Sequence, residues 1–396
     1  METTFFDLPD SPRITVLSWP TRIALGPGAL RRLPDEVRRL GLQRPLLVTD
    51  AGVMKAGLGG RVLAVLGEAG IVHVLFDRVK PDPTEPDVFA GLEAYRTGGC
   101  DGIIALGGGS PLDAAKLIQL LTSHDPPLSQ YDDATGGDRF VTHPLPPLVA
   151  IPTTAGTGSE VSRSGVAFLE DTKRKTVIFA PALLPRAAIV DPELTYGLPQ
   201  RQTAATGLDA FTHCLEAYLS NGFHPLADAV AIDGIRRVAR SLPVVMQQPT
   251  HTGARLDMMI AAMEGAMAFQ KGLGNAHALA HALTPVAGLH HGLANAVVLP
   301  SVMTFNRSAC RARLAHVALA MGEPSGAVEE VLAAVAIDRV RRLVADAGLP
   351  TRLSQAGVKE GDLPRIAELA FRDASHQGNP RPTTEADLLG IARAAF

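Results

Sequence analysis

The chain has 396 residues, of which 46% are hydrophobic and 19% charged, as expected for a soluble globular protein with room for two domains. The net charge is −3, so neither nucleic acid nor an anionic membrane surface is an expected partner. The 3 cysteines are scattered, and neither a leader pattern nor an uninterrupted apolar run of about 20 residues occurs, so we expect a cytoplasmic protein without disulfides.

The first half of the chain alternates short apolar segments with amphipathic ones. The apolar segments predict strands at residues 45–50, 72–76, 102–106, 148–151 and 187–190. Helices are expected between them, near residues 28–40, 53–69, 84–97 and 111–121. Continuous apolar strands that alternate with helices are typical of a mostly parallel sheet covered on both faces. We therefore expect an α/β dinucleotide-binding domain over residues 1–199.

The second half is rich in Ala, Leu, Met and Arg and lacks clusters of β-branched residues. This composition predicts an all-helical domain over residues 200–396. Its helical segments are expected near residues 202–220, 226–241, 253–270, 274–287, 309–321, 326–347 and 385–395. No low-complexity linker separates the two halves, so a cleft between two packed domains is the expected place for a ligand.

A glycine-rich turn follows the predicted strand at residues 102–106. Gly107, Gly108 and Gly109 allow a phosphate to approach the backbone, and a helix then begins with Ser110 as its expected N-cap and Asp113 in a capping-box position. The amides and dipole at a helix N-terminus favour an anion such as a pyrophosphate. Glycines also occur in tight turns without any ligand, and this pattern is not the Gly-x-Gly-x-x-Gly fingerprint.

Two further segments favour a dinucleotide. A turn containing Thr153, Thr154 and Thr157 follows the strand at 148–151, and its hydroxyls suit phosphate, ribose or nicotinamide. Asp50 ends the strand at 45–50, where its carboxylate can accept bonds from ribose hydroxyls and repel a 2′-phosphate. This predicts NAD rather than NADP, although an Asp at a strand end is also a common turn residue.

Histidines and one aspartate recur at helical spacing in the second half. Asp209 and His213 are four residues apart, as are His277 and His281, so each pair lies on one helix face. His291 follows a break at Gly288, where a turn can bring another imidazole to the same point. A single His in an apolar helix is most often a core residue, but this coincidence indicates a site for Fe²⁺ or Zn²⁺.

Four segments carry a resemblance that extends nearly from end to end: residues 107–116, 152–160, 207–218, and 272–281 with 291–296. Residues 190–194 and 378–381 belong to the same pattern. Together they closely resemble the iron-containing (group III) alcohol dehydrogenase family. The resemblance implies an α/β nucleotide-binding domain followed by an all-α metal-binding domain, as in dehydroquinate synthases. It also implies a homo-oligomer, either a dimer or a larger assembly.

The resemblance implies roles for individual residues. The metal ligands would be Asp209, His213, His277 and His291, while His281 would lie near the nicotinamide as a catalytic residue that relays a proton. Residues expected to contact NAD(H) are Asp50, Gly107, Gly108, Gly109, Ser110, Asp113, Thr153, Thr154, Thr157, Val166 and Lys175. The chain departs from the family's frequent Pro-Asn-Pro at Asp82, which lacks an amide donor.

The expected reaction is a reversible hydride transfer between NAD(H) and a small alcohol or aldehyde, with Fe²⁺ or another divalent metal as Lewis acid. Maleylacetate-reductase-like and 4-hydroxybutyrate-type dehydrogenases are alternatives within the same class. A dehydroquinate-synthase-like lyase and a noncatalytic metal-binding protein are alternatives of other classes. Residues expected to line the substrate pocket are Arg163, Phe168, Phe269, Lys271 and His290, and they do not distinguish a simple alcohol from a diol or an ω-hydroxy acid.

Overall fold

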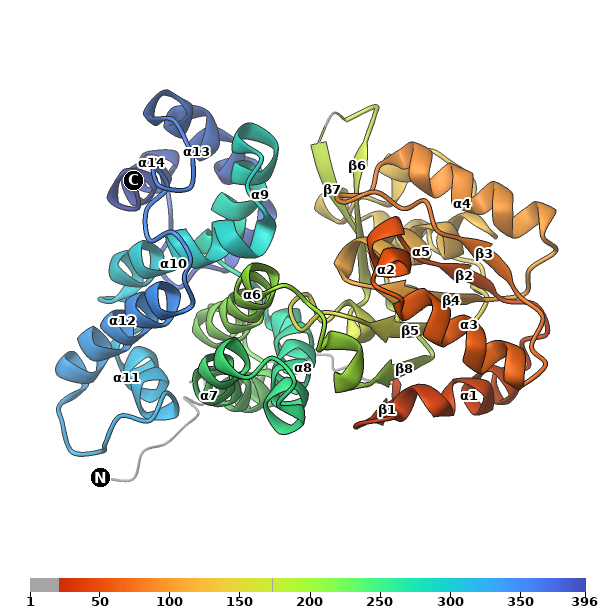
Figure 1. Cartoon of the computed structure of the whole chain (residues 1–396). Helices are drawn as coiled ribbons and strands as arrows, with labels where there is room; N and C mark the ends of the chain where they lie inside the picture. Colours follow the sequence, from red (N-terminus) through yellow and green to blue (C-terminus); the bar gives the residue numbers. More distant parts are fainter. Residues whose placement is uncertain (1–20, 173) are drawn as a thin grey trace. The chain divides into compact units, whose positions relative to one another are not determined.

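The computed structural model of the chain describes residues 21–172 and 174–396 (Figure 1). The described residues form two compact units. The α/β unit extends to Thr154 and resumes over Gly158–Leu198. The helical unit consists of Pro199–Phe396 together with the short segment Ala155–Thr157, which the sequence assigned to the first domain.

The α/β unit is built on a parallel sheet of 6 strands in the order β1-β8-β5-β4-β2-β3. The strands are β1 (Arg22–Leu25), β2 (Leu46–Val48), β3 (Val74–Phe76), β4 (Ile103–Gly107), β5 (Leu148–Pro152) and β8 (Ala187–Val190). All five expected strands are present, and the fold class is confirmed. Strand β1 was not predicted, and it pairs with β8 at the edge of the sheet.

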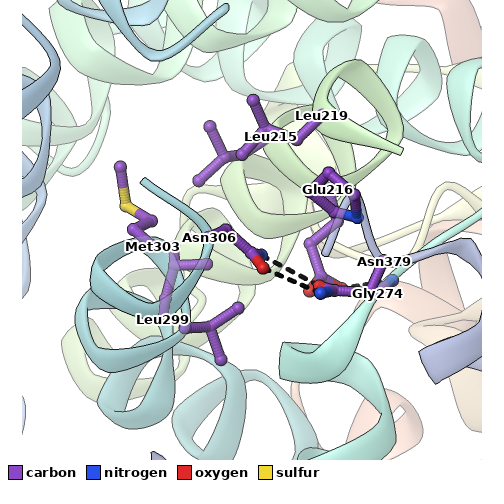
Figure 2. Close-up of a pocket in the computed structure, with 10 residues that line it drawn as sticks. Leu215, Glu216, Leu219, Gly274, Leu299, Met303, Asn306 and Asn379 are labelled. Atoms are coloured by element: carbon purple, nitrogen blue, oxygen red, sulfur yellow. Dashed lines mark hydrogen bonds between the residues drawn. The ribbon is translucent and has the colours of Figure 1, made fainter. Parts of the chain in front are cut away.

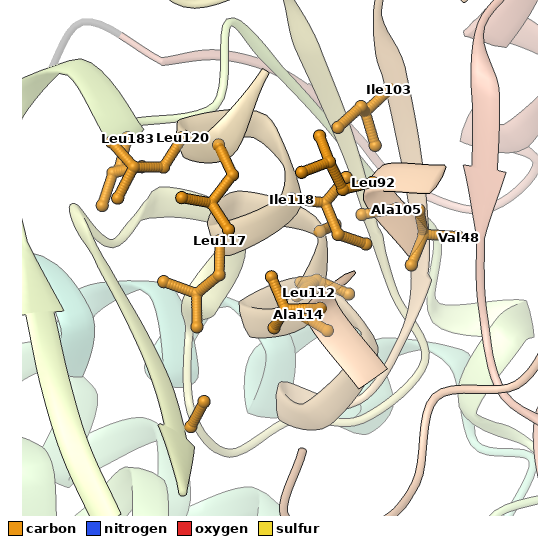
Figure 3. Packing of buried hydrophobic residues seen from close by; sticks show 14 of the residues in the cluster. Val48, Leu92, Ile103, Ala105, Leu112, Ala114, Leu117, Ile118, Leu120 and Leu183 are labelled. Atoms are coloured by element: carbon orange, nitrogen blue, oxygen red, sulfur yellow. The ribbon is translucent and has the colours of Figure 1, made fainter. Parts of the chain in front are cut away.

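Side chains of successive residues in the central strands enter two different cores. Ile103 and Ala105 of β4 pack on one face against α4 (Glu85–Thr97) and α5 (Gly109–Leu121), as Figure 3 shows. Ile104 and Leu106 pack on the other face, in a cluster that includes residues of α1 (Leu33–Arg39) and α3 (Leu58–Glu68). Because alternate residues of a strand point to opposite faces, a strand that is buried on both must be apolar throughout.

A two-stranded antiparallel hairpin of β6 (Ser164–Leu169) and β7 (Arg174–Phe179) follows the second predicted turn. The sequence analysis did not predict these strands. Their burial alternates from residue to residue, so each presents only one buried face, unlike β4 and β5. The hairpin carries Val166 and Lys175, two residues expected at the cofactor site.

The helical unit contains every helical segment predicted for it, together with two helices that were not predicted separately, α10 and α13. Its helices are α6 (Gln200–Leu219), α7 (Pro225–Gln247), α8 (Thr252–Ala268), α9 (Asn275–Ala287), α10 (His291–Asn306), α11 (Arg311–Ala320), α12 (Glu329–Asp346), α13 (Leu363–Arg372) and α14 (Glu385–Ala394). Helix α6 is almost entirely buried, because α7, α8 and α10 all pack against it. No helix among the described residues is both long and apolar enough to cross a membrane.

Candidate metal centre and nucleotide-binding turns

Three helices bring Asp209, His213, His277 and His291 together. Asp209 and His213 lie one turn apart on α6, His277 is on α9, and His291 is the first residue of α10. One potential ligand atom from each of the four residues lies within 4.8 Å of the others. Gly288 ends α9 in the left-handed conformation with φ 67°, and α10 begins three residues later with His291. The break at Gly288 is therefore the turn that the sequence predicted.

Two glycines permit the close approach of helices around these side chains. A Cβ atom on Gly292 would lie 2.3 Å from the carbonyl oxygen of Ala205 on α6. A Cβ atom on Gly265 of α8 would lie 2.9 Å from Cβ of His213. Both distances are shorter than any real Cβ contact, so larger residues at either position would separate the helices that carry the cluster.

The cluster fits a divalent metal ion of borderline softness. Nδ1 of His213 and Nε2 of His277 are buried and have no hydrogen-bond partner among the described residues. Buried polar atoms normally have partners, so a bound ion would account for both. Burial lowers the pKa of His213 to about 4 despite the nearby carboxylate of Asp209, so this imidazole is neutral at neutral pH. Neutral imidazoles with one carboxylate suit Fe²⁺ or Zn²⁺.

Asp209 and His291 have a further neighbour on α10. Asn295, one turn after His291, donates from Nδ2 to Oδ1 of Asp209 at 2.9 Å. The same Asp209 oxygen lies 3.5 Å from Nε2 of His291. Asn295 is fully buried and holds the carboxylate in place, a role that was not predicted from the sequence.

His281 lies beside the cluster without belonging to its four-residue set. Its ring stacks on that of His291 with 5.2 Å between the centroids. Its Nδ1 lies 2.8 Å from Oδ2 of Asp373, which follows α13. Burial opposes ionisation of Asp373, yet His281 and Ser375 outweigh it and hold the pKa of this carboxyl well below its usual range. Asp373 was also not predicted.

The glycine-rich turn differs in detail from the prediction. Helix α5 begins at Gly109 with Gly108 as its N-cap and without a side-chain cap, so the expected N-cap at Ser110 and the capping box with Asp113 are wrong. Ser110 Oγ instead accepts a bond from the Asp82 amide at 3.3 Å. Gly107 has φ 149°, and its carbonyl accepts the Thr153 amide at 2.9 Å, which joins the two predicted turns. Thr154 also lies against the turn, because a Cβ on Gly108 would be 3.3 Å from its Cγ2.

Asp113 points into a buried polar network rather than to the helix start. Its carboxylate accepts from Oγ of Ser159 at 2.7 Å, and burial raises its pKa. Lys116, one turn further along α5, is fully buried and donates to Oγ of Ser159 and to the carbonyls of Ser162 and Ser164. Burial lowers the pKa of Lys116 to about 8. This network ties α5 to the loop that leads into β6.

The remaining predicted cofactor residues lie on separate elements. Asp50 follows β2, the parallel neighbour of β4, and caps α2 (Ala51–Lys55) by accepting from the Val53 amide at 2.8 Å. Because β2 and β4 are parallel, Asp50 and Gly107 both lie where the carboxyl ends of the strands meet. Lys175 forms an ion pair with Asp82 at 2.7 Å, and Asp82 has a positive φ of 50°. Val166 lies in β6 opposite Val177, whereas Thr157 belongs to the helical unit.

One expected pocket residue has a structural role. Nζ of Lys271 is buried and donates to the carbonyl of Tyr218 at 2.9 Å and to Oδ1 of Asp228 at 2.6 Å. Its ammonium is therefore engaged inside the helical unit, which corrects the expectation that it faces a substrate. Phe269 does lie beside the cluster, with its ring centroid 5.3 Å from that of His213.

Both halves of the chain match models of one protein family. Residues 20–192 match the iron-containing alcohol dehydrogenase model, and residues 203–396 match the C-terminal model of the Fe-containing alcohol dehydrogenase family. The chain is 43% identical to a 4-hydroxybutyrate dehydrogenase of Cupriavidus necator, with 93% of this chain and 96% of the relative covered. It is 42% identical to a 1,3-propanediol dehydrogenase of Citrobacter freundii, with 94% and 96% covered.

A solved structure gives the same result. A crystal structure of 1,3-propanediol oxidoreductase superimposes with a TM-score of 0.94 at 40% identity, covering 97% of this chain and 100% of the other. The predicted resemblance, and the predicted class of NAD-linked alcohol oxidoreductase, are confirmed. The chain belongs to the iron-containing alcohol dehydrogenase family.

Proposed function

We propose that this enzyme interconverts a short primary alcohol and its aldehyde, and that the substrate carries a second oxygen function at its far end. The two relatives described above support this class, because one is named for 4-hydroxybutyrate and the other for 1,3-propanediol. The proposal includes the ω-hydroxy acid expected as an alternative. The dehydroquinate-synthase-like lyase is set aside, because both halves match alcohol dehydrogenase models.

The observation that carries the proposal is the buried cluster of Asp209, His213, His277 and His291. These four residues would hold one divalent ion, with Fe²⁺ favoured by the family and Zn²⁺ also suited to the donor set. When bound, the ion would supply a Lewis acid for the substrate oxygen, and NAD(H) would supply or accept the hydride.

His281 is proposed to move the proton that alcohol oxidation releases. Asp373 is ionised and accepts from Nδ1 of His281, so Nε2 is the ring nitrogen left to exchange a proton. Among the described residues, Nε2 of His281 is in no hydrogen bond, and its side chain is 22% exposed. It therefore retains access to solvent, which a proton relay requires.

The α/β unit is proposed to bind the dinucleotide. Amides of Gly108 and Gly109 at the start of α5 suit a pyrophosphate, with Ser110 and Thr154 nearby. Asp50 at the same sheet edge is proposed to accept from ribose hydroxyls and to disfavour a 2′-phosphate. Gly107 and Asp113 are proposed to shape this turn, to which Thr153 is hydrogen-bonded through its amide. The other residues proposed to contact NAD(H) are Val166, Lys175 and Thr157.

The test is a substrate panel with reconstituted enzyme. Purified protein is loaded with Fe²⁺ or Zn²⁺ and assayed with NAD⁺ on 1,3-propanediol, 4-hydroxybutyrate, 1-propanol and 1-butanol. We compare 1,3-propanediol with 1-propanol and 4-hydroxybutyrate with 1-butanol. In at least one pair, we expect kcat/KM for the substrate with two oxygen functions to be higher by about 10-fold or more, which is the effect of roughly one or two additional polar contacts. Higher kcat/KM for both simple alcohols would refute the substrate class.

Metal binding has its own control in the same experiment. We expect one ion per chain in the wild type, and His291→Ala should lose a ligand and most of the metal. His290→Ala, at the adjacent position outside the cluster, should retain it. Full metal occupancy with wild-type turnover in His291→Ala would refute the ligand set. A homo-oligomer is also proposed, from the family resemblance, and sedimentation of the pure protein tests it. The cytoplasmic location expected from the sequence stays a proposal.

A further inference from the structure

We propose that Glu216 is a positioning residue of the metal centre, which selects the tautomer of His277 and fixes the start of α9. This inference rests on the proposed metal site. It goes beyond the ligand set, because Glu216 would act through His277 and would not contact the ion. The residue lies on α6, three positions after His213, and is 5% exposed.

The Glu216 carboxylate receives four hydrogen bonds from one turn of α9. Its Oε2 lies 2.7 Å from Nδ1 of His277 and accepts the amides of Gly274 and His277 at 3.1 and 3.2 Å. Its Oε1 accepts the Ala276 amide at 2.7 Å. Helix α9 has no side-chain cap of its own, since its N-cap is Gly274. The carboxylate therefore supplies the acceptors that the first amides of a helix lack.

These contacts determine which nitrogen of His277 is available to a metal. Because Oε2 of Glu216 already accepts the amides of Gly274 and His277, this oxygen is an acceptor toward the imidazole and not a donor. The imidazole must therefore carry its proton on Nδ1 and donate it to Glu216. The lone pair then resides on Nε2, which is the buried atom without a partner among the described residues. An orienting acceptor behind a metal-binding His typically contributes about 10–100-fold in metal affinity.

A second clamp, formed by Asn379, holds the same turn of α9. Asn379 accepts from the Asn275 amide at 3.4 Å and exchanges two bonds with Asn306 of α10, at 2.9 and 2.7 Å. Figure 2 shows Glu216 together with Asn379 and Asn306, whose side chains are joined by hydrogen bonds. A Cβ on Gly274 would lie 2.8 Å from Oε1 of Glu216 and 3.0 Å from Oδ1 of Asn379. Only glycine allows both side chains to reach the helix start.

The two clamps differ in one respect that allows a test. A cavity of about 10 Å³ beside them is lined by Glu216, Asn306 and Asn379 among others. Both side chains hold the backbone of α9, but among the described residues only Glu216 hydrogen-bonds the ring of His277. Loss of Asn379 therefore loosens the helix start, whereas loss of the Glu216 carboxylate also removes the acceptor that keeps the proton of His277 on Nδ1.

The experiment compares Glu216→Gln with Asn379→Ala. The Gln side chain has nearly the same size, but its NH₂ group must face either a backbone amide or His277, and facing His277 favours the wrong tautomer. Metal-free protein is titrated with Zn²⁺ in competition with a chromophoric chelator, and the Tm of each metal-free variant is measured in parallel. We expect Glu216→Gln to weaken Zn²⁺ binding by about 10–100-fold. Asn379→Ala should lower Tm at least as much as Glu216→Gln does. Its Kd for Zn²⁺ should differ from that of the wild type by less than about 3-fold.

Different outcomes separate this inference from the proposed function. Zn²⁺ binding by Glu216→Gln with the wild-type Kd overturns the positioning role alone, as does an equal loss of affinity in both variants. Absence of binding by the wild type overturns the metal site and the inference with it. If Glu216→Gln does not fold, ¹⁵N chemical shifts of the imidazoles in metal-free wild-type protein decide the matter. An Nδ1–H tautomer for His277 supports the inference, and an Nε2–H tautomer refutes it.

Discussion

Gly292 offers a sharp test of how closely the metal centre depends on helix packing. The residue directly follows His291 in α10, and a Cβ there would lie 2.3 Å from the Ala205 carbonyl oxygen and 3.1 Å from Cβ of Asp209. Ordinary contact begins at 3.4 Å, so Gly292→Ala requires α10 and α6 to separate by roughly 1 Å. The obstructing atom belongs to the backbone of α6, which has no rotamer through which to move aside.

A separation of this size has two measurable effects. Overpacking of a buried contact costs about 1–3 kcal/mol of unfolding free energy. Metal–ligand distances tolerate changes of only about 0.2 Å, so a displacement of His291 relative to Asp209 by roughly 1 Å exceeds this tolerance severalfold. We therefore expect Gly292→Ala to remain folded with a lowered Tm, and to bind Zn²⁺ at least about 10-fold more weakly than the wild type.

The assay uses thermal unfolding of the metal-free protein together with a Zn²⁺ competition titration. Gly390→Ala is the matched control, because it lies in the exposed part of α14 and a Cβ there would meet no atom within 4 Å. The control should keep the wild-type Kd and gain a few tenths of a kcal/mol, up to about 1, from helix propensity. Wild-type Tm and Kd in Gly292→Ala would show that the helices accommodate the methyl group, and the packing argument would be wrong.

Three further changes test other parts of the structure. His281→Ala should keep its metal but lose about 10²–10⁴-fold in alcohol oxidation and alter the pH–rate profile, and loss of metal would instead make His281 a ligand. Asp50→Gly should raise kcat/KM for NADPH relative to NADH, and a wild type that already prefers NADPH would contradict the assigned role. Burial raises the pKa of Glu160 to about 7 from 4.5, so its protonated form stabilises the fold at low pH and this contribution is lost as pH rises from 4.5 through 7. The Tm of Glu160→Gln minus the Tm of the wild type should therefore increase between pH 5 and pH 7.5, because only the wild type has a carboxyl that ionises. A Tm difference that does not change with pH would refute the burial argument.

The sequence alone determined the features that depend on neighbouring residues. Apolar runs such as residues 102–106 predict a strand buried on both faces, because the strand's own side chains must satisfy both environments. The spacing of Asp209 and His213 places both on one helix face wherever that helix packs. Gly288 similarly marked a break after the helix, and the structure shows there a left-handed helix end with φ 67°.

Local pattern was not sufficient where a side chain had two possible partners. Ser110 and Asp113 have the residue types and the spacing of a helix cap, yet Ser110 bonds Asp82 and Asp113 bonds Ser159. Both partners come from other segments, which only the tertiary fold brings next to α5. The hairpin was also missed, because β6 gains its buried face from α5 and β7 from the short helical turns at residues 128–140, and neither strand is a continuous apolar sequence.

Only the tertiary structure decided how the histidines are oriented. Glu216 and His277 are 61 positions apart, and Asp373 and His281 are 92 apart, so no periodicity in the sequence relates them. Each pair forms because helix packing brings a carboxylate to the back of an imidazole, where a hydrogen bond then selects the protonated nitrogen. The residue types of the proposed site are thus a property of the sequence. The lone pairs that would face an ion are a property of the packed fold.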